Sequence, residues 1–149
     1  MGSYRSAEKK DLDAVVRMGR NLHAESRFAY MPFSEERALR TMGYCQEIGY
    51  LMLYVDTDDT LLGFMAGISG PKFFSDAIEA VELCLWLEPA ARKSGIAGRM
   101  IGMFAEWAKS KGAVEACGGS TGGLNADALR LIYGQVDFVP VGELFVRRF

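Results

Sequence analysis

The residues between Arg92 and Gly98 form a short basic turn whose composition suits the binding of an anion. The turn follows an apolar strand that ends at Pro89, and an amphipathic helix comes after it. Backbone N–H groups at a helix N-terminus, together with the helix dipole, favour negatively charged groups such as phosphates. Gly95 allows backbone conformations and close approaches that a side chain would obstruct. The turn therefore predicts a phosphate site, and its plainer interpretation is an ordinary strand-to-helix turn with solvated basic residues.

Glu82 lies inside the apolar strand that leads to this turn. A carboxylate in a central strand needs either a partner or a chemical purpose, because its burial is otherwise costly. It could accept a proton as a general base, or it could form an ion pair with a basic neighbour. Regular alternation along the strand predicts that Glu82 shares a face with Cys84 and Trp86. Glu79 is the second candidate for the same role.

Hydrophobic periodicity predicts the elements that position these residues. Strands are expected at Tyr4–Ser6, Tyr50–Val55, Leu61–Ile68, Ala80–Leu87, Ala113–Cys117, Phe138–Val141 and Leu144–Arg148. Helices are expected at Lys9–Ser26, from an N-cap at Ser34 to Glu47, over Ile96–Lys111, and at Asn125–Tyr133. Gly70–Pro71 is expected to break the chain. The strand–helix–strand unit requires a parallel pair and the hairpin around Asp58 an antiparallel one, so a mixed sheet covered by helices follows.

Composition excludes several classes of protein. The chain has 149 residues, half of them hydrophobic, and a formal net charge of −2, so we expect one folded domain over residues 1–149 and no nucleic-acid partner. Three separated cysteines and one histidine predict neither a metal site nor disulfides, and free thiols suit the cytoplasm. No apolar run reaches the roughly 18 residues of a membrane span, so we expect no membrane partner.

The strand and turn also carry a recognisable pattern. It is a strand ending L-x-V-x-P, then x-x-[QR]-x-x-G-x-[GA], then a helix, and it is occupied here by Leu85, Leu87, Pro89, Arg92, Gly95 and Ala97. With the order of elements, this pattern resembles the GNAT superfamily of acyl-CoA-dependent N-acetyltransferases. Near the C-terminus, Tyr133 is followed by Asp137–Phe138 where that family has Gly–Phe.

The resemblance implies a fold, a reaction and a set of roles. The fold is an α/β (α+β) GNAT-like domain, with a mixed, mostly antiparallel sheet, a central parallel β-α-β unit and flanking helices. The reaction moves an acetyl group from acetyl-CoA to a primary amine by direct attack in a ternary complex. Glu82 would be the base and Tyr133 the acid. Residues expected to bind the cofactor are Leu85, Trp86, Leu87, Arg92, Lys93, Ser94, Gly95, Ile96, Ala97, Gly98 and Asn125.

The acceptor amine, a small molecule or a peptide, would meet Glu25, Arg27 and Tyr30, and family analogy suggests a homodimer through the C-terminal strands. Several alternatives remain open from the residues alone. Tyr133 could simply pack one face of its helix, and Asn125 could cap that helix. The whole chain could be a non-catalytic acyl-CoA-binding or regulatory module on the same fold.

Overall fold

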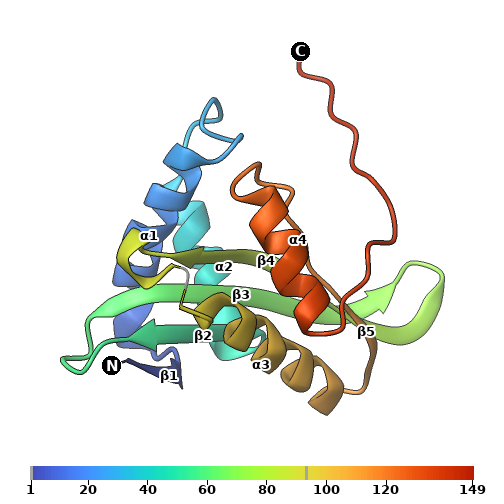
Figure 1. The fold of residues 1–149 in the computed structure, drawn as a ribbon, viewed down its shortest axis with the longest axis horizontal. Helices are drawn as coiled ribbons and strands as arrows, with labels where there is room; N and C mark the ends of the chain where they lie inside the picture. Colours follow the sequence, from blue (N-terminus) through green and yellow to red (C-terminus); the bar gives the residue numbers. More distant parts are fainter. Residues whose placement is uncertain (1, 93) are drawn as a thin grey trace.

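The structure is a computed structural model that describes residues 2–92 and 94–149. A five-stranded sheet of order β1-β2-β3-β4-β5 lies at its centre (Figure 1). The strands are β1 (Ser3–Ser6), β2 (Tyr50–Val55), β3 (Leu61–Lys72), β4 (Ser75–Leu87) and β5 (Ala113–Cys117). The helices are α1 (Leu12–Glu25), α2 (Glu35–Glu47), α3 (Ile96–Ser110) and α4 (Ala126–Gln135), with short 3-10 turns at Lys9–Asp11 and Pro89–Ala91. β4 and β5 are parallel and the other neighbours antiparallel, which confirms the expected mixed sheet.

Helices cover both faces of the sheet. α1 and α2 lie on one face, over a core that includes Val15 and Phe64, and α3 and α4 lie on the other (Figure 1). On α3 the spacing of three and four residues brings Met100, Ile101 and Phe104 onto the buried side, where all three are fully buried. None of the described helices is long and apolar enough to cross a bilayer.

Strands β3 and β4 form a long hairpin that passes through the expected break at Gly70–Pro71. Pro71 lies inside β3 and pairs with Ile78 of β4, so the prediction that the strand ends before Pro71 was wrong. β2 pairs with β3 only as far as Gly67, and Pro71 therefore lies where β3 has one neighbour. A missing N–H donor is tolerated on such an edge segment.

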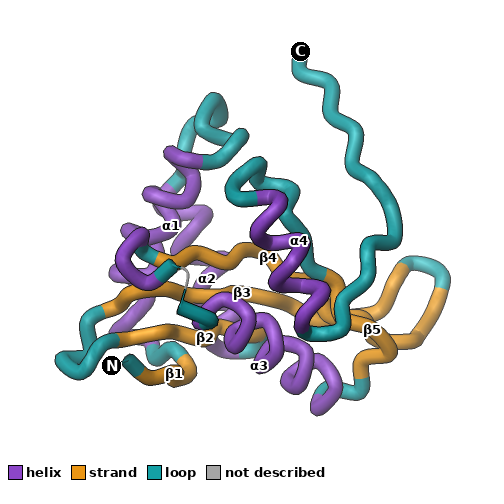
Figure 2. The backbone as a smooth tube through the Cα atoms, in the orientation of Figure 1, coloured by secondary structure: helices purple, strands orange, loops and turns teal. Residues whose placement is uncertain are grey.

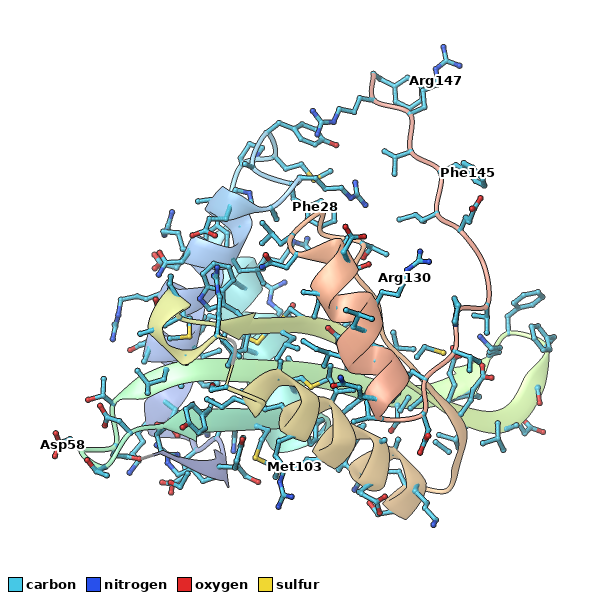
Figure 3. The ribbon with its side chains drawn as sticks, viewed as in Figure 1. Phe28, Asp58, Met103, Arg130, Phe145 and Arg147 are labelled. Atoms are coloured by element: carbon cyan, nitrogen blue, oxygen red, sulfur yellow. The ribbon has the colours of Figure 1, made fainter. Side chains whose placement is uncertain are left out.

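The C-terminal segment after α4 differs most from expectation. The predicted strands at Phe138–Val141 and Leu144–Arg148 are absent from the described structure, where residues 139–149 form an extended tail without strand pairing (Figure 2). Phe145 and Arg147 stand apart from α4 (Figure 3), and the Phe145 side chain is exposed. The alternating pattern fits a strand, but an isolated segment without a neighbouring strand cannot satisfy its backbone hydrogen bonds as sheet.

Candidate functional site

The sheet opens between β4 and β5. The two strands pair from Ile78 with Ala113 to Val81 with Cys117, and β5 then ends. From Glu82 to Leu87, β4 pairs with β3 on one side and with no described strand on the other. Leu85, Trp86 and Leu87 therefore present an outer edge that can receive another extended chain.

The predicted anion site follows the end of this open edge. Gly95 adopts a left-handed backbone (φ 79°) at the N-cap of α3, and the first helical hydrogen bond runs from the Arg99 N–H to the Gly95 carbonyl. The N–H groups of Ile96, Ala97 and Gly98 precede it and have no acceptor within the helix. Ser94 is exposed and its hydroxyl donates to the Ala91 carbonyl at 2.7 Å. Lys93 lies outside the described residues.

Arg92 does not point freely into solvent. Its Nε donates to the Leu87 carbonyl at 2.9 Å, and its guanidinium carbon lies 4.6 Å from the centre of the Trp86 ring. A guanidinium nitrogen also lies 3.8 Å from a carboxylate oxygen of Glu25. Arg92 thus ties the end of β4 to the C-terminal end of α1, and Glu25 is engaged beside the turn.

A β-bulge determines which face of the sheet Glu82 occupies. Ala66 of β3 pairs with Cys84 and its neighbour Gly67 pairs with Glu82, so Leu83 is an extra residue in β4. Cys84 and Trp86 face the α1–α2 core, whereas Glu82 contacts Tyr133 of α4 on the opposite side. The expected common face was therefore wrong, because a bulge reverses the alternation of side chains.

Glu82 and Tyr133 form a carboxyl–phenol pair. The Tyr133 hydroxyl donates a hydrogen bond to Oε2 of Glu82, and the tyrosine side chain is buried. Burial raises the pKa of Glu82 from 4.5 to about 7, while a hydrogen bond from the backbone N–H of Gly119 lowers it in part. A carboxyl group that is half ionised near neutral pH can both accept and return a proton.

The turn after α4 holds Tyr133 in place although Asp137 stands where the resembling pattern has glycine. Asp137 adopts the left-handed backbone (φ 68°) that glycine would otherwise supply, a conformation aspartate tolerates better than most residues. Phe138 then folds back, donating its N–H to the Tyr133 carbonyl at 3.0 Å and packing edge-on against the Tyr133 ring at 5.2 Å. The substitution of aspartate for glycine therefore preserves the turn.

The glycine-rich loop (residues 118–123) belongs to the site, and sequence reasoning identified it only as a loop. A Cβ on Gly118 would lie 2.6 Å from the Tyr133 hydroxyl and 2.7 Å from a Glu82 carboxylate oxygen. A side chain at Gly118 would therefore push the carboxyl–phenol pair apart. The sequence signal that could have revealed this role is the run of glycines directly after a strand, because such a run allows the backbone to approach another group closely.

The remaining predicted residues are placed unevenly. Asn125 is the N-cap residue of α4, as the cap interpretation expected, but it has a left-handed backbone and its side chain makes no capping bond. Tyr30 is half exposed, and Arg27 is bonded to the glycine-rich loop. Glu79, the second candidate base, forms an ion pair with Lys72 at 2.6 Å.

Two features lie outside this arrangement. Oxygens of Glu79 and Glu115 and the sulfur of Cys117 lie within 4.8 Å of one another, as the ligands of a metal ion would. The Glu79 carboxylate, however, already forms an ion pair with Lys72. A groove of about 850 Å³ lies between α3 and the β1–β2 side of the sheet, and Gly98 is its only predicted cofactor residue. The carboxyl–phenol pair is not part of that groove.

Comparisons with known proteins place this geometry in a family. The chain matches the model of the Acetyltransferase (GNAT) family over residues 19–132. A search of curated protein sequences gives no significant match. Solved structures with a similar fold include a Trypanosoma brucei acetyltransferase, with 15% identity, a TM-score of 0.75 and full coverage of both chains. A transcriptional regulator from Bacillus halodurans is similar at 20% identity and a TM-score of 0.76, again over both whole chains. A predicted acetyltransferase from Clostridium acetobutylicum, solved with acetyl-CoA, is similar at 18% identity and a TM-score of 0.74, over 99% of this chain and 96% of that one. The family model covers most of the sequence, and the chain belongs to the Acetyltransferase (GNAT) family.

Proposed function

We propose that this protein transfers an acetyl group from acetyl-CoA to a primary amine by direct attack in a ternary complex. The observation that carries the proposal is the carboxyl–phenol pair at one end of the open edge of β4, with the N-terminus of α3 following the other end. Glu82 and Leu87 are separated by about 16 Å of extended strand. A ligand with a thioester at one end of an extended arm and a pyrophosphate at the other matches this arrangement.

Acetyl-CoA would lie along that edge. Its pantetheine arm would pair with the backbone of Leu85, Trp86 and Leu87 as an added strand, a mode supported by the lack of a neighbouring strand on that side among the described residues. The N–H groups of Ile96, Ala97 and Gly98 would bind the pyrophosphate, since helix N-termini favour such anions. Gly95 leaves room for the phosphates, and Ser94 and Lys93 would border them. Arg92 would hold the turn in position, and the uncommitted Asn125 side chain would contact the arm.

The reaction would need only proton transfers and correct positioning. The nitrogen of the neutral amine attacks the thioester carbonyl carbon, and Glu82 accepts the proton that this nitrogen loses as the C–N bond forms. A backbone N–H of the strand stabilises the oxyanion. The C–S bond breaks, the leaving thiolate takes the hydroxyl proton of Tyr133, and the hydrogen bond between the two residues lets Glu82 return its proton to Tyr133. Both side chains end the cycle in their starting state.

A thiol-release assay with acetyl-CoA and a panel of amines tests this proposal. Small amines, amino acids and peptides should be compared for the wild type, Glu82→Gln and Tyr133→Phe. Each substitution should lower kcat by about 100-fold or more, because general acid–base groups contribute about 10² to 10⁴ to a rate. Binding of acetyl-CoA by calorimetry without turnover of any acceptor would refute catalysis and support the regulatory module. Absence of acetyl-CoA binding would refute both.

We further propose that residues 1–149 act as one catalytic domain in the cytoplasm, where the free thiols of Cys45, Cys84 and Cys117 would stay reduced. A homodimer would cover the exposed apolar side chains of the tail, among them Val139, Val141, Leu144 and Phe145. Sedimentation of the full chain and of a chain ending at Asp137 tests the dimer. The full chain should sediment as a dimer and the truncated chain as a monomer, and a monomeric full chain would refute the proposal.

A further inference from the structure

The glycine-rich loop requires an anchor. Its sequence, Gly118-Gly119-Ser120-Thr121-Gly122-Gly123, has glycine at four of six positions. Glycine loses more conformational freedom on ordering than any other residue, so such a loop is costly to hold in one conformation. Yet the loop must be held in place, because its backbone at Gly118 packs against the Glu82 carboxylate, where a Cβ would lie 2.7 Å from a carboxylate oxygen.

Arg27 provides contacts at the other end of the loop. Its backbone N–H donates to the Gly122 carbonyl at 2.9 Å, and its side-chain Nε donates to the Thr121 carbonyl. The Arg27 guanidinium lies over the Phe28 ring, and its central carbon is 4.2 Å from the ring centre. Arg148 of the tail in turn donates to the Arg27 carbonyl at 3.0 Å. Arg27 is therefore fixed by its own neighbours and directs its donor at the loop.

We propose that Arg27 is a positioning residue that holds the glycine-rich loop so that the loop backbone stays packed against the Glu82 carboxylate, an inference that rests on the proposed role of Glu82 as base. Two residues, Gly119 and Ser120, lie between Gly118 and Thr121, so a displacement at the Arg27 end is transmitted through one short stretch of backbone. The sequence analysis expected Arg27 to contact the acceptor amine. In this proposal Arg27 instead affects proton transfer by holding the loop.

The surroundings of Glu82 make its titration a sensitive readout. Tyr133 approaches it from α4, Cys84 lies near it on β4, and the loop backbone packs against it at Gly118. Among the described residues no lysine, arginine or histidine lies within 4 Å of its carboxylate. The Gly119 backbone lowers the pKa of Glu82, so displacement of the loop is uncompensated and should raise that pKa.

The test is a carbon-13 NMR titration of protein labelled at its glutamate carboxyl groups, with the Glu82 signal assigned from Glu82→Gln. Arg27→Ala should raise the Glu82 midpoint by about half to one pH unit. The control Arg37→Ala removes a cation from α2 without touching the loop and should leave the midpoint unchanged. The titration is repeated in 1 M NaCl, where the Debye length falls to about 3 Å and the remote charge of Arg27 is screened.

Each outcome decides the proposal. A raised midpoint in Arg27→Ala that persists in 1 M NaCl supports it, and an unchanged midpoint in a folded variant overturns it. A shift that disappears in salt also overturns it, because the charge of Arg27 would then be its cause. If Arg27→Ala does not fold, Arg27→Gln keeps the aliphatic stem and carries the same expectation. The titration needs no acceptor or acetyl-CoA, so a failure of the proposed function would leave this result readable.

Discussion

Ionisation of Glu82 should make the protein less stable as the pH rises from about 4.5 to about 7. The unfolded chain releases this proton near its ordinary pKa of 4.5, while the folded protein retains it until the pH reaches about 7. Between those values the folded state binds more protons, so the free energy of unfolding falls with increasing pH. The difference corresponds to about 3 kcal/mol, since one pKa unit is worth about 1.36 kcal/mol.

Glu82→Gln removes the ionisation and keeps an oxygen that can accept the Tyr133 hydrogen bond. Urea unfolding of both proteins at pH 4.5, 6, 7 and 8.5 should give similar stabilities at the lowest pH, and a variant more stable by about 3 kcal/mol at the highest. Glu106→Gln, which changes an exposed carboxylate on α3, should leave the pH profile of the wild type unaltered. If the free energies of unfolding of wild type and Glu82→Gln differed by the same amount at all four pH values, the reasoning would be refuted. A buried ionisable group requires that this difference change with pH.

Three further substitutions test other parts of the structure. Gly118→Ala should lower kcat by about 100-fold through displacement of the carboxyl–phenol pair, whereas Gly119→Ala, whose Cβ would meet only Thr121 at 3.7 Å, should have a smaller effect in the thiol-release assay. Phe104→Ala should cost about 3–5 kcal/mol in urea unfolding, because this ring is fully buried, and a loss below 1 kcal/mol would contradict that packing. Ser34→Ala should cost about 1 kcal/mol by removing the N-cap bond of α2, while Ser34→Thr, which keeps a hydroxyl, should cost less.

Elements with a strong local signal were predictable from the sequence. The boundaries of β2 and β5 agree with expectation, and so does the N-cap at Ser34, whose hydroxyl accepts the Arg37 N–H at 3.2 Å. The strand-to-helix turn that ends at Gly95 was also predictable, because proline, glycine and basic residues together indicate such a connection. These features depend on residues within a few positions of one another.

The remaining features depend on contacts between distant segments. The bulge at Leu83 arises from how β4 pairs with β3, and its trace in the sequence is Gly67, where a Cβ would lie 2.6 Å from Phe104. The contact of Arg27 with Thr121 joins residues 94 positions apart, so no local pattern could indicate it. The alternation in the C-terminal tail fits a strand, but forming one also requires a free neighbouring edge, which local sequence does not report.

The extra residue at Leu83 also bears on how changes in chain length would affect the protein. A deletion of one residue between Glu82 and Cys84 would restore regular alternation and turn the carboxyl group toward the α1–α2 core, away from Tyr133. Most substitutions at Leu83, whose side chain is partly exposed, would leave the carboxyl group where it is. The number of residues in this part of β4 is thus under stricter constraint than their identity. A sequence alignment that ignored insertions and deletions here would not reveal that constraint.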